Sequence, residues 1–285
     1  MVGVHPTRIL LAGDIHGDLP FLARVADRAV DEGCSTILQL GDLGALWPGS
    51  DAFLPAIDEL LVESGIDRLV FVDGNHEGFV TRVLFRGVDG GTAAGGLAAA
   101  RRRSEETVEG FRSLSERVQW IPRGTRWEWN GVRLGAIGGA FSVDWRRRTP
   151  GENWWPDHEN VADADVERLG AGPLDVLVTH DVPLGVPMDA ISTFPLSPSD
   201  ESNCALTRER LREAVEATQP SLVLHGHWHW KYGADLDWPD SDGRARRTRV
   251  EGFGANLDRD VDWATAVLDL SDGTPSLPTG PPMPV

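Results

Sequence analysis

The chain has 285 residues, 41% of them hydrophobic, which is an ordinary composition for a globular protein. Its formal net charge is −17 at pH 7, and its isoelectric point is near 4.8. This acidity disfavours non-specific binding to nucleic acid or to anionic membranes, because both depend on lysine and arginine side chains that neutralise phosphate. We expect a single domain over residues 1–270.

Several features of the sequence favour a cytoplasmic location. An apolar run at residues 8–13 begins almost at once, which leaves no room for a secretory leader. No apolar stretch approaches the roughly 18 residues of a membrane span. Cys34 and Cys204 are the only cysteines, and two cysteines cannot build a disulfide framework. The sequence therefore predicts no membrane partner and is compatible with a reducing compartment.

Apolar runs alternate with amphipathic stretches over the first 72 residues. Strands are predicted at residues 8–13, 36–40 and 68–72, and helices at residues 19–32 and 51–63. Continuous apolar strands separated by helices are typical of a parallel sheet that is covered on both faces. The first part of the chain therefore predicts repeated β-α units.

The pattern weakens at residues 79–109, where five glycines lie between residues 87 and 96. We predict a mobile insertion that leads into a helix. A nucleotide-binding loop is disfavoured, because no lysine followed by serine or threonine closes the glycine pattern. Residues 271–285 are rich in proline, glycine, serine and threonine, and this composition predicts a disordered tail.

A hairpin is predicted in the middle of the chain, where the β-α alternation stops. Strands at residues 126–129 and 132–137 flank Asn130-Gly131, a dipeptide typical of tight hairpin turns. Further strands are predicted at residues 173–179, 221–224, 248–253 and 263–270, and a further helix at residues 206–217.

Side chains that bind metals follow most of these strands. The candidate ligands are Asp14, His16, Asp42, Asn75, His180, His227 and His229. Asp14 and His16 lie two residues apart, so both point the same way in an extended segment. Seven ligands exceed the needs of one ion and suit two ions that share a carboxylate. Two such ions clamp the attacking and leaving oxygens of a displacement at phosphorus and make hydroxide available near neutral pH.

The ligand types do not select one metal. Mixed nitrogen and oxygen donors without thiolate admit Mn²⁺, Fe and Zn²⁺. We therefore expect two divalent ions of one or two of these elements.

The order of the blocks resembles the calcineurin-like metallophosphoesterase superfamily, whose hallmark is D-x-H, G-D, G-N-H-[DE], H and G-H-x-H. All five blocks occur between Asp14 and His229. The resemblance implies an α/β fold in which a two-sheet β-sandwich is flanked by helices and carries ligands at the strand ends. It also implies residue roles: Asp14, His16 and His229 hold one metal, Asn75, His180 and His227 hold the other, and Asp42 bridges them.

The same resemblance implies that His76 is catalytic. It would contact the substrate phosphate and protonate or stabilise the leaving oxygen, which suits an imidazole that titrates near neutral pH. His225 lies just outside the G-H-x-H block and receives no role, so we expect a buried or supporting histidine.

The second block departs from the protein Ser/Thr phosphatase branch. That branch carries G-D-x-V-D-R-G, whereas Gly41-Asp42 is followed here by Leu-Gly-Ala, without the second aspartate or the arginine. This difference favours a substrate other than a phosphoprotein. The stretch at residues 138–148, with Trp154-Trp155, is instead similar to bacterial and phage members of the superfamily.

That stretch suggests a substrate wall. Arg146, Arg147 or Arg148 could bind a phosphate oxygen, and Trp154 or Trp155 could stack on a base. The alternative is that the tryptophans pack in the core and that the arginines are solvated.

The sequence predicts a dinuclear metal-dependent phosphoesterase that hydrolyses small phosphate mono- or diesters by attack of a metal-activated hydroxide. A phosphodiesterase or nuclease that acts on nucleic acid is a second hypothesis, which arginine clusters at residues 101–103, 146–148 and 244–249 keep open despite the acidic charge. A metal-binding scaffold without turnover is a third, and His76 counts against it because a scaffold needs no leaving-group acid.

Overall fold

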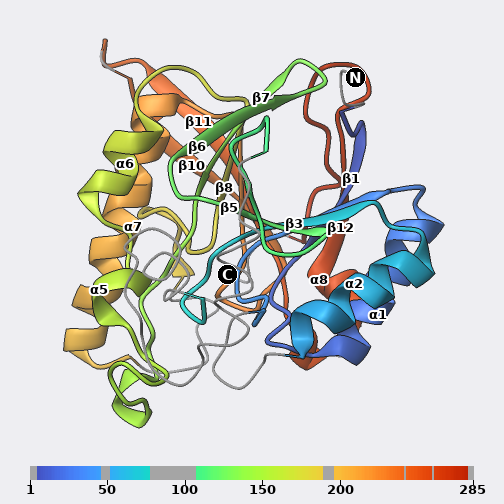
Figure 1. The fold of residues 1–285 in the computed structure, drawn as a ribbon. Helices are drawn as coiled ribbons and strands as arrows, with labels where there is room; N and C mark the ends of the chain where they lie inside the picture. Colours follow the sequence, from blue (N-terminus) through green and yellow to red (C-terminus); the bar gives the residue numbers. More distant parts are fainter. Residues whose placement is uncertain are drawn as a thin grey trace.

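The computed structural model describes residues 5–45, 52–77, 107–188, 196–240, 242–258 and 260–281 (Figure 1). Two six-stranded sheets pack face to face, and helices cover their outer faces. The predicted α/β sandwich flanked by helices is confirmed. The predicted insertion at residues 79–109 lies outside the described residues except for its last three positions.

The first sheet has four parallel strands between two antiparallel edge strands. Its order is β12 (Thr265–Asp269), β1 (Arg8–Ala12), β2 (Thr36–Gln39), β3 (Arg68–Val72), β5 (Val118–Ile121) and β4 (Arg112–Ser113). Helices α1 (Leu19–Asp31) and α2 (Phe53–Ser64) pack on its outer face. The β-α units predicted for residues 8–72 are therefore confirmed.

The second sheet repeats this plan. Its order is β10 (Tyr232–Pro239), β11 (Ala245–Gly252), β9 (Leu222–His225), β8 (Val176–Thr179), β7 (Val132–Ile137) and β6 (Thr125–Trp129), and only the two edge pairings are antiparallel. Helices α6 (Asp163–Leu169) and α7 (Pro198–Thr218) cover its outer face. The predicted Asn130-Gly131 turn joins β6 and β7, and both residues have positive φ.

Short helical turns complete the described chain. These are η1 (Trp145–Arg147), α5 (Pro156–Glu159), η3 (Asn256–Asp258) and α8 (Val261–Ala264). No helix in the described ranges combines the length and apolarity that a membrane crossing requires.

Strand β1 is apolar from Ile9 to Ala12 because both of its faces are buried there. In β1, Ile9 and Leu11 pack in the core between the sheets, whereas Leu10 and Ala12 face the helices. Successive side chains of a strand point to opposite faces, so a strand covered on both sides reads as a continuous apolar run. The core between the sheets thus holds the strand ends of the two sheets next to each other.

The prediction of a disordered tail from residue 271 onward is wrong for residues 271–281. Ser276 exchanges two backbone hydrogen bonds with Asp269, and Pro281 accepts one from Gly233 at 2.8 Å. Leu277 packs against the core between the sheets. The composition suggested disorder, but this stretch is tied to β12 and β10. Residues 282–285 lie outside the described chain.

Candidate metal centre

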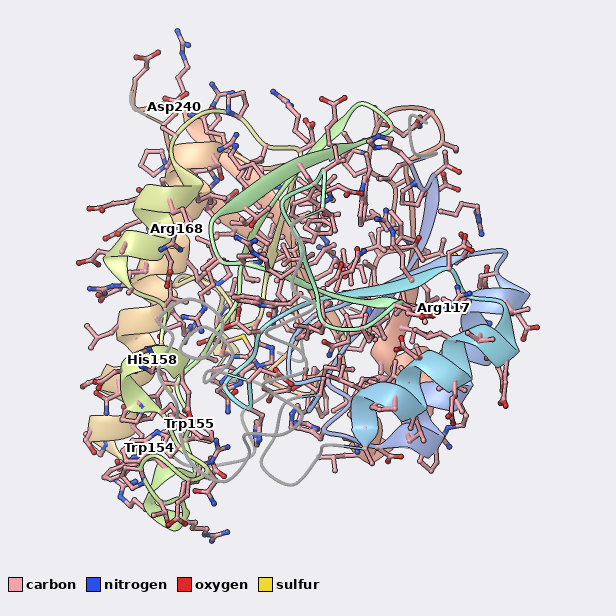
Figure 2. The ribbon with its side chains drawn as sticks, in the orientation of Figure 1. Arg117, Trp154, Trp155, His158, Arg168 and Asp240 are labelled. Atoms are coloured by element: carbon pink, nitrogen blue, oxygen red, sulfur yellow. The ribbon has the colours of Figure 1, made fainter. Side chains whose placement is uncertain are left out.

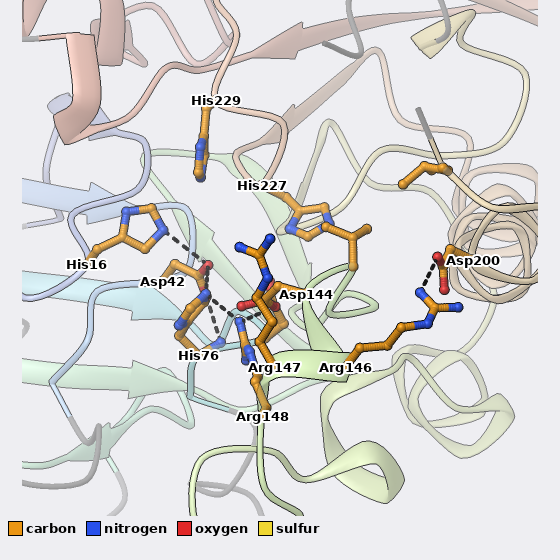
Figure 3. Close-up of a pocket in the computed structure, with 13 residues that line it drawn as sticks. His16, Asp42, His76, Asp144, Arg146, Arg147, Arg148, Asp200, His227 and His229 are labelled. Atoms are coloured by element: carbon orange, nitrogen blue, oxygen red, sulfur yellow. Dashed lines mark hydrogen bonds and ion pairs between the residues drawn. The ribbon is translucent and has the colours of Figure 1, made fainter. Parts of the chain in front are cut away.

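The seven predicted ligands lie on loops that follow parallel strands. Asp14 and His16 follow β1, Asp42 follows β2, Asn75 follows β3, His180 follows β8, and His227 and His229 follow β9. The carboxyl ends of parallel strands lie at one edge of a sheet, which is where open α/β sheets bind ligands. Here both sheets contribute, and Figure 3 shows side chains from both around one cavity.

Among the described residues, three groups of donor atoms form at this edge, and one of them, His16, Asp42 and His76, overlaps the other two. The side-chain donors of Asp14, His16 and His229 lie within 4.8 Å of one another, and so do those of Asp42, His180 and His227. Asp14 Oδ2 is 3.0 Å from His229 Nε2 and 3.7 Å from His16 Nε2. The structure thus brings together residues that the family resemblance assigned to the same ion.

Asp42 lies between the two groups. Its Oδ2 is 3.5 Å from His16 Nε2, and its Oδ1 is 3.5 Å from His180 Nε2. Asn75 Oδ1 is 3.3 Å from His180 Nε2, which places the amide oxygen in the second group. One carboxylate therefore faces both groups, the geometry that a bridging ligand requires.

The buried carboxylates of Asp14 and Asp42 make the electrostatic potential of the site negative. Burial alone would raise the pKa of Asp42, yet the His76 and His180 imidazoles hold that pKa well below its usual value. Burial opposes protonation of His180, but the Asp42 carboxylate raises its pKa to about 10. Such a potential favours the binding of cations at this edge of the sheets.

Hydrogen bonds fix the orientation of two of the imidazoles. His180 Nδ1 donates to the Leu40 carbonyl at 2.7 Å, which leaves Nε2 toward Asp42. His16 Nδ1 lies 3.0 Å from Asn256 Oδ1, and Asn256 Nδ2 donates to Asp18 at 3.2 Å, so its Oδ1 accepts from His16. Partners of this kind set the ring tautomer of a metal-binding histidine. The sequence reasoning missed Asn256, which is brought to His16 by η3.

Left-handed backbone is concentrated in the ligand loops. Six non-glycine residues in the described chain have positive φ, and four of them are the predicted ligands His16, Asp42, His227 and His229. This conformation is uncommon for residues with a Cβ and costs about 1 to 2 kcal/mol each. It turns each loop sharply, so that neighbouring side chains converge.

Three glycines leave space for ligands from other loops. A Cβ at Gly41 would lie 2.1 Å from His180 Nδ1, one at Gly74 would lie 2.1 Å from Asp42 Oδ1, and one at Gly226 would lie 2.2 Å from Asp14 Oδ1. Close backbone approach of this kind requires glycine. The glycines of the sequence blocks are therefore part of the site's packing.

Glu77 ties two of the ligand loops together. Its buried carboxylate accepts hydrogen bonds from the backbone N–H of Asp42 at 3.0 Å, of Gly74 at 2.9 Å and of Gly44. Burial raises the pKa of Glu77 to about 8, and the Asp42 carboxylate acts in the same direction. The acid of the third sequence block thus fixes the loops after β2 and β3 relative to each other.

His76 lies at the floor of the cavity beside Asp42. Its Nε2 is 3.6 Å from Asp42 Oδ2 and 2.9 Å from an Arg148 guanidinium nitrogen. Burial lowers the pKa of His76; Asp42 opposes this shift, and Arg148 adds to it. Arg148 also pairs with Asp144 at 2.7 Å. An imidazole and a guanidinium therefore face the same space above the metal-type ligands.

The cavity has a volume of about 520 Å³ and combines metal-type ligands with arginines. Its lining includes His16, Asp42, Asn75, His76, His227, His229 and the three consecutive arginines at 146–148 (Figure 3). Arg146 pairs with Asp200 on α7 at 2.7 Å. Asp14 and His180 are fully buried beneath the cavity.

The sequence matches the family model described as calcineurin-like phosphoesterase over residues 7–231. The chain belongs to this family. A search of curated proteins found no match.

Solved structures resemble this phosphoesterase over nearly its whole length. TT1561 of Thermus thermophilus is 16% identical, with 97% of this chain and 99% of that chain covered and a TM-score of 0.49. A dimetal phosphatase from Danio rerio is 12% identical, with 93% of each chain covered and a TM-score of 0.49. Another solved chain, 12% identical over 96% of this chain and 99% of its own, has a TM-score of 0.51 and shares the fold.

Trp154 and Trp155 do not line the cavity of this phosphoesterase, so the predicted stacking wall is not found at these two residues. Trp155 is 8% exposed and packs in the core beneath the first sheet. Trp154 stacks on Trp145, with ring centroids 5.3 Å apart. Figure 2 shows both tryptophans beside His158, along the α5 segment. The three arginines predicted with them do line the cavity.

His225 has a supporting role in the phosphoesterase fold. It is fully buried, its Nδ1 donates to the Gly226 carbonyl at 2.9 Å, and its Nε2 lies 2.6 Å from the Tyr232 hydroxyl. Burial lowers the pKa of His225 to about 4, so the ring is neutral. These contacts anchor the loop that carries His227 and His229.

The donor set of the phosphoesterase fits two divalent cations. Buried carboxylates, an amide oxygen and imidazole nitrogens face one another in two groups that meet at Asp42. Neither group contains a thiolate, and such nitrogen and oxygen sets suit Mn²⁺, Fe and Zn²⁺ alike.

Proposed function

We propose that this phosphoesterase uses two divalent metal ions to hydrolyse small phosphate mono- or diesters. Asp14, His16 and His229 would hold one ion, Asn75, His180 and His227 the other, and Asp42 both. The observation that carries the proposal is the position of Asp42, whose two carboxylate oxygens each lie 3.5 Å from an imidazole of a different ligand group. Two cations at these positions would polarise the phosphoryl group and activate a water molecule for in-line attack.

The chain's own residues would bind the phosphate and assist the leaving group. Arg148 reaches His76 at the cavity floor, so one of its hydrogen bonds can pass to a phosphate oxygen while the guanidinium stays in place. His76, next to Asp42, is positioned to protonate or stabilise the leaving oxygen. Arg147 is exposed and lines the same cavity, where it can meet a second oxygen of the ester.

Hydrolysis of p-nitrophenyl phosphate and bis-p-nitrophenyl phosphate by metal-stripped protein with added Mn²⁺ tests the proposal. We expect metal-dependent turnover that Asp42→Asn abolishes and that Asp237→Asn, an exposed aspartate on β10, retains. The preferred ester separates a monoesterase from a diesterase. Equal activity of Asp42→Asn and the unaltered protein would overturn the proposed role of Asp42.

Action on nucleic acid is the second candidate. It requires arginine clusters that can bind the phosphate backbone. In the cluster at residues 244–249, Arg246 pairs with Asp240 at 2.8 Å, and Arg247 pairs with Asp237 at 2.7 Å. These cations are therefore balanced by acids on the same hairpin. If the enzyme were a nuclease, its activity on DNA or RNA would fall steeply as salt is raised.

A scaffold without turnover is the third candidate. It would bind two ions per chain and leave both nitrophenyl esters and nucleic acid intact. The cavity that joins His76 and the arginines to the metal-type ligands favours catalysis instead.

A further inference from the structure

The orientation of the Asn75 amide decides whether this residue can bind a metal. An amide ligates through its oxygen, whereas its nitrogen is a hydrogen-bond donor. Here Oδ1 is 3.3 Å from His180 Nε2, and Nδ2 donates to Ser142 Oγ at 3.1 Å. Both Asn75 and Ser142 are buried, so water does not replace this contact.

Ser142 in turn donates its hydroxyl proton to Glu159. The second oxygen of Glu159 accepts from the Trp155 backbone N–H at 2.8 Å. At pH 8, above its raised pKa, the Glu159 carboxylate is ionised and only accepts hydrogen bonds, so the single proton of Ser142 is committed to Glu159. The oxygen of Ser142 is then left to accept from Asn75. Glu159 therefore sets the direction of these hydrogen bonds. Asn75 donates through Nδ2 to Ser142, and its Oδ1 faces His180.

Arg123 anchors both ends of this chain. Its buried guanidinium donates to the backbone carbonyls of His158 at 2.9 Å, Glu159 at 3.1 Å and Asn160 at 2.8 Å. It also donates to the Asp73 carboxylate at 2.8 Å, two residues before Asn75. The backbone of Glu159 and the loop that carries Asn75 are thus held on the same side chain.

We propose that Ser142 and Glu159 are positioning residues that hold Asn75 with its amide oxygen toward the ion shared with His180 and His227. This inference rests on the proposed function, which makes Asn75 a metal ligand. Ser142 and Glu159 belong to none of the five ligand blocks, and the contact exists because α5 packs beside the loop that follows β7.

Glu159→Gln is the decisive variant, because it keeps the size of the side chain. The new amide can donate to Ser142, which then donates to Asn75 and favours the reversed amide. Ser142→Ala removes the acceptor altogether and leaves Glu159 bonded to Trp155. We expect either variant to raise the Mn²⁺ dissociation constant of the site formed by Asn75, His180 and His227 about 10- to 100-fold, the usual effect of losing a partner of a metal ligand. The site formed by Asp14, His16 and His229 should keep its dissociation constant.

Titration calorimetry with Mn²⁺ measures both dissociation constants. Burial raises the pKa of Glu159 to about 7, although Ser142 and Trp155 lower it, so the titration is run at pH 8. Glu209→Gln and Ser202→Ala, two exposed positions on α7, serve as matched controls.

The ratio of the two dissociation constants distinguishes a positioning role from a purely structural one. A purely structural role would lower the melting temperature of the variants without changing this ratio, and wild-type constants in Ser142→Ala would overturn the proposal even if Glu159→Gln failed to fold. An unaltered protein that binds fewer than two Mn²⁺ ions would instead refute the proposed function.

Discussion

Replacing Gly74 with alanine tests the position of Asp42 by a steric route alone. The new Cβ would lie 2.1 Å from Asp42 Oδ1 and 2.5 Å from Asp42 N, where ordinary contact begins at 3.4 Å. Gly74, unlike Gly41, has no positive φ, so the backbone itself accepts a side chain. Both the carboxylate and the backbone nitrogen of Asp42 must therefore move, by about 1 Å, and a misplacement of this size costs about 100-fold in rate, or about 2.7 kcal/mol of transition-state stabilisation.

The assay compares kcat/KM on the better nitrophenyl ester with the free energy of unfolding in urea. Gly135→Ala is the matched control, because its Cβ would lie 2.5 Å from Leu174 Cδ1, in a contact between β7 and the loop before β8. Overpacking should cost each variant about 1 to 3 kcal/mol of stability, whereas only Gly74→Ala should lose activity. Activity of Gly74→Ala within about threefold of the unaltered enzyme would refute the reasoning, since a rate difference that small is below about 1 kcal/mol.

Three further predictions concern stability and reactivity. Arg123→Met leaves Asp73 buried without its partner and should lower the free energy of unfolding by about 3 to 5 kcal/mol in urea titrations; a loss below about 1 kcal/mol would contradict the ion pair's role. Mn²⁺ at about 100 times its dissociation constant should stabilise the native state by about 2.7 kcal/mol in thermal melts, and an equal gain in Asp42→Asn would argue against this site. Cys34 and Cys204 are each 3% exposed, and burial raises both thiol pKa values, that of Cys204 to about 12, so Ellman's reagent should label them only in urea. Rapid labelling of the native protein would show that the packing around these two thiols opens.

The central strands could be predicted because their signal is local. Residues 9–12 and 69–72 are apolar and buried on both faces, and each run is followed closely by a ligand block. The edge strand β10 was missed because its outward positions carry Asp235 and Asp237, which interrupt the apolar run. Its inward positions, Leu236 and Trp238, do follow the two-residue period of a half-buried strand.

The supporting residues of the site depend on tertiary contacts that no short pattern contains. Glu159 reaches Ser142 from 17 residues away, and Asn256 reaches His16 across 240 residues. The same limit left two readings open at Trp155, because a tryptophan beside arginines can either stack on a ligand or fill a core. Only the packing of Trp155 in the core between the first sheet and its helices decides between them.

The left-handed backbone at His16, Asp42, His227 and His229 lowers the stability of the fold at residues that the proposed metal sites require. Glycine adopts this conformation without the penalty of about 1 to 2 kcal/mol that other residues incur, so exchanging such a ligand for glycine relaxes the loop as it removes a metal donor. Laboratory evolution that rewards only heat resistance of the metal-free protein should therefore enrich glycine at these four positions. A thermostable variant obtained in that way would keep the two-sheet fold but lack metal ligands and activity. Selection for stability should therefore be carried out with metal bound.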